Sequence, residues 1–137
     1  MFYSRNVVSN TLLYERPDDS MDAFSQSLAE MRTAQRRFAA AGVQARVAML
    51  AAFADRLEAE KTKLARMICE EVGRCLRECE AEMDKSVSLI RYYVKLAPQL
   101  LQHQTIATQA SLSQVRFEPL GVVLAVMPWN YPVWQII

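Results

Sequence analysis

Apolar side chains recur every three or four residues through most of the first hundred positions, which is the spacing of amphipathic helices. Three such stripes predict helices over residues 21–38, 47–68 and 76–97. Charged residues fill the positions between the stripes, so each helix should present an apolar face and a solvated face. We therefore expect residues 18–110 to be mainly helical.

The boundaries of these helices have their own sequence signals. Residues 18–20, Asp-Asp-Ser, offer N-caps and early negative charge to the first helix. Gly42 interrupts the first stripe, and Gly73 is a natural stop for the second. Pro98 lacks a backbone donor and disfavours helix at the preceding residue, so it should end or kink the third helix.

The pattern changes after about residue 111. Residues 102–114 are polar and rich in serine and threonine, which predicts a loop, and residues 115–118 alternate apolar and charged side chains, which predicts a half-exposed strand. Leu120–Met127 is a continuous apolar run whose valines favour a strand covered on both faces, as in parallel sheets. Such a strand needs neighbours that these residues do not supply. We therefore expect the front part of a larger α/β protein.

Composition narrows the classes of function. The chain has 137 residues, of which 52% are hydrophobic and 23% charged, so it is not a disordered composition. The net charge of +1 gives no reason to expect nucleic acid or an anionic membrane as a partner. With only three glycines, the chain cannot hold a glycine-rich phosphate loop.

The first residues contain no apolar stretch long enough for a signal peptide. The three cysteines are an odd number, which argues against a disulfide framework and favours the reducing cytoplasm. Cys75 and Cys79 share a helix face with Cys69 just upstream, but a metal site would need a fourth ligand, and the only histidine, His103, is distant in sequence. We expect idle thiols and no metal.

Residues 120–137 carry no charge and approach the roughly 20 residues that span a bilayer. Pro128, Asn130, Pro132 and Gln135 interrupt the run, however, and no basic flank follows. We therefore interpret this stretch as a buried strand and a turn, not as a membrane anchor.

Several motifs, in order, resemble the N-terminal part of the NAD(P)-dependent aldehyde dehydrogenase superfamily. The most specific pair is Glu118-Pro119-Leu120-Gly121 followed by Pro128-Trp129-Asn130-Tyr131-Pro132. Glu71-Val72-Gly73-Arg74 resembles the turn between two long helices of the family, and residues 82–86 and 91–93 resemble the helix after it. Trp134-Gln135 looks like the succinate-semialdehyde dehydrogenase branch. The resemblance covers about residues 18–137.

The resemblance implies an aldehyde dehydrogenase-type α/β fold with an incomplete Rossmann-like cofactor domain. Residues 1–17 lack the family's usual opening and are expected to be irregular, and residues 18–110 would be the helical part of the cofactor-binding domain. Residues 111–119 would be a strand of the oligomerisation arm, and residues 120–137 the first buried strand and the active-site turn. The catalytic domain would follow beyond them.

The resemblance also implies roles for single residues. Asn130 would be the oxyanion-hole donor, although an asparagine beside prolines can also be an ordinary turn residue. Four residues would border NAD or NADP: Val126, Met127, Pro128 and Trp129. Tyr131 and Trp134 would line the substrate tunnel, although Trp134 can equally be a core aromatic.

The predicted function is oxidation of a small aldehyde, such as a semialdehyde, by a homo-oligomeric enzyme, with these residues inactive by themselves. Two alternatives remain open: a stand-alone helical interaction module, and a truncated fragment that poisons assembly of an intact enzyme. The module alternative does not explain a buried strand and a Pro-Trp-Asn turn after three helices.

Overall fold

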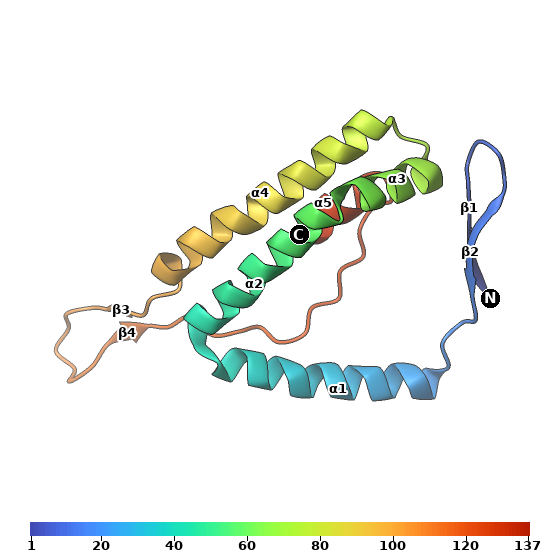
Figure 1. The fold of residues 1–137 in the computed structure, drawn as a ribbon. Helices are drawn as coiled ribbons and strands as arrows, with labels where there is room; N and C mark the ends of the chain where they lie inside the picture. The colour runs from blue at the N-terminus through green and yellow to red at the C-terminus, as the bar shows by residue number, and fades with distance from the viewer.

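A computed structural model describes residues 1–137 (Figure 1). It is rich in helix and has two small antiparallel sheets of two strands each. The elements, in chain order, are β1 (Phe2–Arg5), β2 (Leu12–Arg16), α1 (Met21–Ala40), α2 (Gly42–Ala59), α3 (Lys61–Val72), α4 (Leu76–Leu100), β3 (Gln104–Thr105), β4 (Gln114–Val115) and α5 (Pro132–Ile136).

The predicted helix boundaries are largely confirmed. Ser20 caps α1, because its Oγ accepts a hydrogen bond from the backbone N–H of Ala23 at 3.1 Å. Gly73 ends α3 in the left-handed conformation, with φ of 78°, and its N–H bonds to the carbonyl of Cys69 at 2.9 Å. Pro98 does not stop α4, which continues to Leu100. A proline so close to a helix end removes only one of the last backbone hydrogen bonds.

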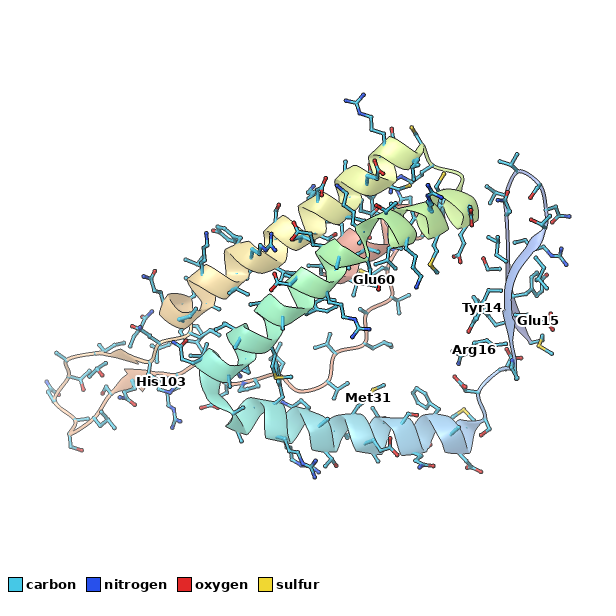
Figure 2. All side chains as sticks on the ribbon, viewed as in Figure 1. Tyr14, Glu15, Arg16, Met31, Glu60 and His103 are labelled. Carbon is cyan, nitrogen blue, oxygen red and sulfur yellow. The ribbon has the colours of Figure 1, made fainter.

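The second predicted helix is two helices in the structure. The break falls at Glu60, which lies at the junction between α2 and α3 (Figure 2). No helix on its own is long and apolar enough to cross a membrane, although α1 and α2 together, bent by 116° at their junction, meet the length and composition of a broken span. Gly42 forms that junction with φ of 77°.

The core lies where α4 packs along both α2 and α3, which follow each other nearly end to end (Figure 1). Its buried apolar members are Ala54, Leu57, Ala65, Ile68, Cys79, Met83, Val87 and Ile90. Only 11 of the 137 residues are buried, and α1 has none of them, so much of the apolar surface that the stripes predicted faces outward. Those faces are available for packing against further protein.

The N-terminal segment corrects one prediction. Residues 1–17 were expected to be irregular, but β1 and β2 pair as an antiparallel hairpin. Asn6 closes its turn, because its side-chain oxygen accepts the backbone N–H groups of Val8 and Ser9, at 2.9 and 3.0 Å. The tip contacts the end of α3: the N–H of Val7 donates to the carbonyl of Glu70 at 3.2 Å.

The second correction concerns Leu120–Met127. The sequence predicted a buried strand, but these residues form no strand and are exposed. None of their backbone groups bonds to another backbone group. A strand obtains its hydrogen bonds from neighbouring strands, and none of the strands in residues 1–137 lies beside this run. The predicted loop at 102–114 contains β3, and only Val115 of the predicted strand at 115–118 is paired, within β4.

Candidate functional site

The Pro-Trp-Asn turn leads directly into the short helix α5, which packs against α4. Tyr131 precedes the helix and Pro132 occupies its first turn, where the missing N–H of a proline is no loss. Val133 and Ile137 pack against the core cluster. The turn is thus attached to the best-packed part of the molecule, although Asn130 itself is exposed.

Glu82, on α4, anchors the start of α5. Its side chain is fully buried, with 0% exposed. One carboxylate oxygen, Oε1, accepts the backbone N–H groups of Val133 at 3.0 Å and of Trp134 at 3.1 Å. These are orphan donors of a helix N-terminus, where negative charge is also favourable. The carboxylate therefore caps α5 from a distant part of the chain.

Arg74 completes the arrangement. Its Nη1 donates to Oε2 of Glu82 and, at 3.0 Å, to the backbone carbonyl of Asn130. The central guanidinium carbon of Arg74, Cζ, lies over the ring of Tyr131, 4.0 Å from the ring centre. Burial acts to lower the pKa of Arg74, but the hydrogen bond and the charge of Glu82 outweigh it, so the pKa is raised and the side chain stays charged.

Asn130 is therefore held by its backbone and free at its side chain. Its carbonyl bonds to Arg74, whereas its side-chain amide makes no hydrogen bond within the chain. Because no other group of the chain uses this amide, it remains available to donate to a ligand. With its backbone held, Asn130 can present this amide to an oxygen that acquires negative charge.

The residues predicted to border the cofactor are exposed to solvent. Val126 and Trp129 are 81% and 74% exposed, and Met127 and Pro128 between them are also on the surface. They offer apolar surface that a flat ring could cover. With three glycines, none of them adjacent, the 137 residues contain no glycine-rich turn that could hold phosphates. The fit to a dinucleotide is thus limited to an apolar border.

The structure brings Tyr131 and Trp134 together, with ring centres 6.4 Å apart in an edge-to-face arrangement. The ammonium group of Lys85 lies 3.6 Å from the centre of the Trp134 ring. Trp134 is half-buried, and its Nε1 is buried without a hydrogen-bond partner. Trp134 is thus partly a packing residue of α5.

The roles of Arg74 and Glu82 were not predicted from the sequence. The motifs containing both were noted, but neither side chain was assigned a contact. A signal was present: Glu82 adjoins Met83 in the third apolar stripe, and a charge on a buried face needs a partner. The three cysteines are free and no group of three acidic, cysteine or histidine side chains is arranged for a metal. His103 lies at the opposite end of α4 from Cys75 (Figure 2).

Comparison with known proteins defines the class. The profile described as "Aldehyde dehydrogenase family" matches residues 2–137. The chain belongs to the aldehyde dehydrogenase family, as its Pro-Trp-Asn turn predicted.

Individual relatives are similar over parts of their length. The chain is 44% identical over 89 residues to succinate-semialdehyde dehydrogenase (NADP(+)) of Mycobacterium avium (strain 104), covering 63% of this chain and 19% of that protein. It is 40% identical over 123 residues to succinate-semialdehyde dehydrogenase (NADP(+)) 1 of Mycobacterium bovis (strain BCG / Pasteur 1173P2), covering 88% of this chain and 26% of that protein.

The fold is also shared with solved structures. The NADP-dependent glyceraldehyde-3-phosphate dehydrogenase from Bacillus halodurans C-125, complexed with NADP, superposes with a TM-score of 0.89 at 28% identity, over 98% of this chain and 29% of that one. The predicted aldehyde dehydrogenase-type fold is therefore confirmed. The chain spans between about a fifth and a third of the length of these three proteins.

Proposed function

We propose that this chain supplies the first part of an NAD(P)-dependent aldehyde dehydrogenase that oxidises a semialdehyde, such as succinate semialdehyde, to the carboxylic acid. Family membership supports the reaction class, and the relatives named succinate-semialdehyde dehydrogenase support the substrate class. The observation that carries the proposal is Asn130, whose backbone is fixed and whose side-chain amide is free.

In this reaction a thiolate adds to the aldehyde carbon, and the carbonyl oxygen becomes an oxyanion. The side-chain N–H of Asn130 donates to that oxygen. Because the backbone of the turn is held before the substrate arrives, only rotation of the side chain remains to bring the donor to the oxygen. Removal of one such donor costs about 2.7–4 kcal/mol in the barrier, or roughly a hundredfold or more in rate.

Val126, Met127, Pro128 and Trp129 would form the apolar border of NAD or NADP, which when bound accepts the hydride. Their exposure supports this assignment, since each still has surface to cover. Tyr131 would place its ring at the substrate side of the turn, and Trp134 would form the wall beneath it. The contact between the two rings supports that layering.

The domain layout is also a proposal. Residues 18–110 would form the helical part of the cofactor-binding domain, and residues 111–119 would belong to an arm that pairs subunits of a homo-oligomer. The β3–β4 hairpin lies beyond the end of α4 (Figure 1), and Val115 in β4 and Phe117 just after it are exposed. Exposed strand edges of this kind can pair with another chain. Three free cysteines support a reducing compartment, the cytoplasm.

A chimera tests the catalytic assignment. In it, this chain replaces the matching residues of the Mycobacterium bovis enzyme, with which it shares 40% identity over 123 residues. Asn130→Ala should lower kcat by about a hundredfold or more and leave the Kd for NADP nearly unchanged, because the amide acts only when charge develops. Trp129→Ala is the matched neighbour. It should raise the Kd for NADP between about tenfold and a hundredfold, since covering a large apolar side chain contributes about 1.5–3 kcal/mol.

The two substitutions lie side by side in the sequence but should affect different steps. Loss of NADP affinity in Asn130→Ala, with unchanged single-turnover oxidation, would rule out the oxyanion role. A chimera that binds NADP but oxidises no semialdehyde would contradict the proposed reaction.

The 137 residues assayed by themselves should oxidise no aldehyde. The resemblance places the nucleophilic cysteine downstream of the Pro-Trp-Asn turn, and no cysteine follows Asn130 here. The alternative of an assembly-poisoning fragment predicts that the chain co-purifies with an intact relative and lowers its activity. A simple inactive chain would leave that activity unchanged.

A further inference from the structure

We propose that Arg74 and Glu82 are positioning residues, which hold the Asn130 turn from both sides so that the amide of Asn130 points at the reacting oxygen. This inference rests on the proposed oxyanion role of Asn130. Neither residue carries chemistry of its own in the reaction. Each acts through the backbone of the turn.

The geometry assigns one residue to each side of Pro132. Upstream, Arg74 donates to the carbonyl of Asn130 at 3.0 Å. Downstream, Oε1 of Glu82 accepts two N–H groups at the start of α5. The two side chains are joined to each other by their own ion pair. The turn is thus closed by a continuous chain of hydrogen bonds, which we call the clamp: Asn130 carbonyl, Arg74, Glu82, α5 backbone.

The clamp is buried at Glu82 and attached there to the core. The side chain of Arg74 is 13% exposed and that of Glu82 is 0% exposed, so water competes little for the ion pair between them. Glu82 lies beside Met83, which is fully buried in the core cluster. The bond from Arg74 to the carbonyl of Asn130 lies at the surface, but the buried carboxylate of Glu82 holds both Arg74 and the start of α5.

Replacement of Arg74 by lysine should remove contacts that hold the turn. A guanidinium has a planar fork of five N–H donors, and Arg74 lies over the ring of Tyr131 while its Nη1 donates to both Glu82 and Asn130. An ammonium group is a compact point charge on a flexible stem and does not reproduce this set of contacts. Arg74→Lys should therefore keep the charge and lose the positioning.

A second arginine, Arg91 on α4, provides the control. Arg91 bonds to Asp55 at 2.9 Å and to Glu58 at 2.7 Å, which joins α4 to α2. Its side chain is 44% exposed and contacts no residue of the turn. Arg91→Lys thus makes the same chemical change in an ion pair that does not reach Asn130.

The first experiment uses the 137-residue chain itself. Amide hydrogen exchange, followed by NMR, should show the N–H groups of Val133 and Trp134 protected in the wild type. Glu82→Gln and Arg74→Lys should accelerate their exchange, and Arg91→Lys should not. Equal exchange in all four chains, or no protection in the wild type, would overturn the clamp without reference to any activity.

The second experiment measures catalysis in the chimera, with kcat expressed per titrated catalytic thiol. Arg74→Lys and Glu82→Gln should each lower kcat between about tenfold and a hundredfold, since a displacement of about 1 Å can cost that much. The Kd for NADP should change less than about twofold, and Arg91→Lys should leave both quantities unchanged.

The decisive readout is non-additivity with Asn130→Ala. If the clamp acts through Asn130, then Arg74→Lys should cause no further loss of kcat once Asn130 is alanine. A merely structural role would cause the same proportional loss in both backgrounds, and that result would overturn the positioning role. If instead Asn130→Ala has no effect by itself, the proposed function fails, which is a separate and distinguishable outcome.

Discussion

The helices α2 to α4 and the segment of residues 118–130 carry similar apolar side chains and have opposite structures. The helices are regular and enclose the core, with Met83 and Cys79 fully buried. The segment is extended, exposed and free of backbone pairing, with Leu120 and Leu124 almost wholly open to solvent. The apolar content of a sequence therefore does not decide burial by itself.

The difference lies in where each region obtains its hydrogen bonds. A helix satisfies its backbone within four residues, so only its apolar stripe needs a neighbour. A strand needs another strand before it has any structure at all. Residues 118–130 have their apolar side chains ready but no strand beside them, whereas α2, α3 and α4 are adjacent in sequence and cover one another.

The largest expected effect is a loss of stability on substitution of a residue in the buried core of α2 to α4. Met83→Ala should lower the free energy of unfolding of the 137-residue chain by about 2–5 kcal/mol, because it removes a large side chain from a site with 0% exposure. Met49→Ala is the matched control on α2, at 60% exposure, and should change stability by less than about 0.5 kcal/mol. Urea titration followed by circular dichroism measures both. Equal losses would contradict the assignment of the core.

The same contrast explains what the sequence could predict. Helix positions and caps were predictable because their determinants are local: Ser20 caps from within one turn, and Gly73 ends α3 by its own backbone. The hairpin of residues 2–16 was missed, since its only marked signal is an asparagine turn at Asn6 without a glycine. The prediction of a strand at 120–127 was wrong for these 137 residues, because the pairing of such a strand depends on residues far away in sequence or outside them.

The site divides in the same manner. Asn130 could be singled out because the prolines and aromatics around it form a compact motif. Arg74 could not be assigned, because it reaches the carbonyl of Asn130 from 56 positions away in the sequence. Glu82 meets α5 from a similar separation, and only the three-dimensional packing of α4 against α5 shows the contact. Long-range polar contacts of this kind leave little mark on a single sequence.

A smaller effect is expected on the open side of the comparison. Val123 is 71% exposed, so Val123→Lys should change the free energy of unfolding of the 137-residue chain by less than about 0.5 kcal/mol. It should nevertheless reduce self-association, because a charge interrupts an apolar, β-prone run with unpaired edges.

Val123→Thr, which keeps the branched shape without a charge, is the control and should reduce self-association less. Analytical ultracentrifugation over a range of concentrations decides. A wild-type chain that stays monomeric at high concentration would show that the exposed segment of residues 118–130 does not cause self-association. In the chimera, by contrast, Val123→Lys should prevent folding, because the strand is then expected to be covered on both faces.

The smallest expected effect is a difference in reactivity between two thiols that lie only four positions apart. Cys75 is exposed at the start of α4, whereas Cys79 is fully buried one turn later. Burial raises the pKa of the Cys79 thiol, and the nearby charge of Arg74 offsets only part of the increase. Iodoacetamide at pH 8 should therefore alkylate Cys75 well before Cys79, as mass spectrometry of the digested chain would show.

The direction of the pH dependence follows from the same shift. The fold holds Cys79 as the neutral thiol, so its stabilising contribution is complete below the unfolded pKa of about 8.5 and is lost as the pH rises through the higher folded value. The stability advantage of the wild type over Cys79→Ala should thus shrink between pH 7 and pH 10. Equal alkylation rates at pH 8, or an advantage that grows with pH, would mean that Cys79 does not belong to the buried side of the comparison.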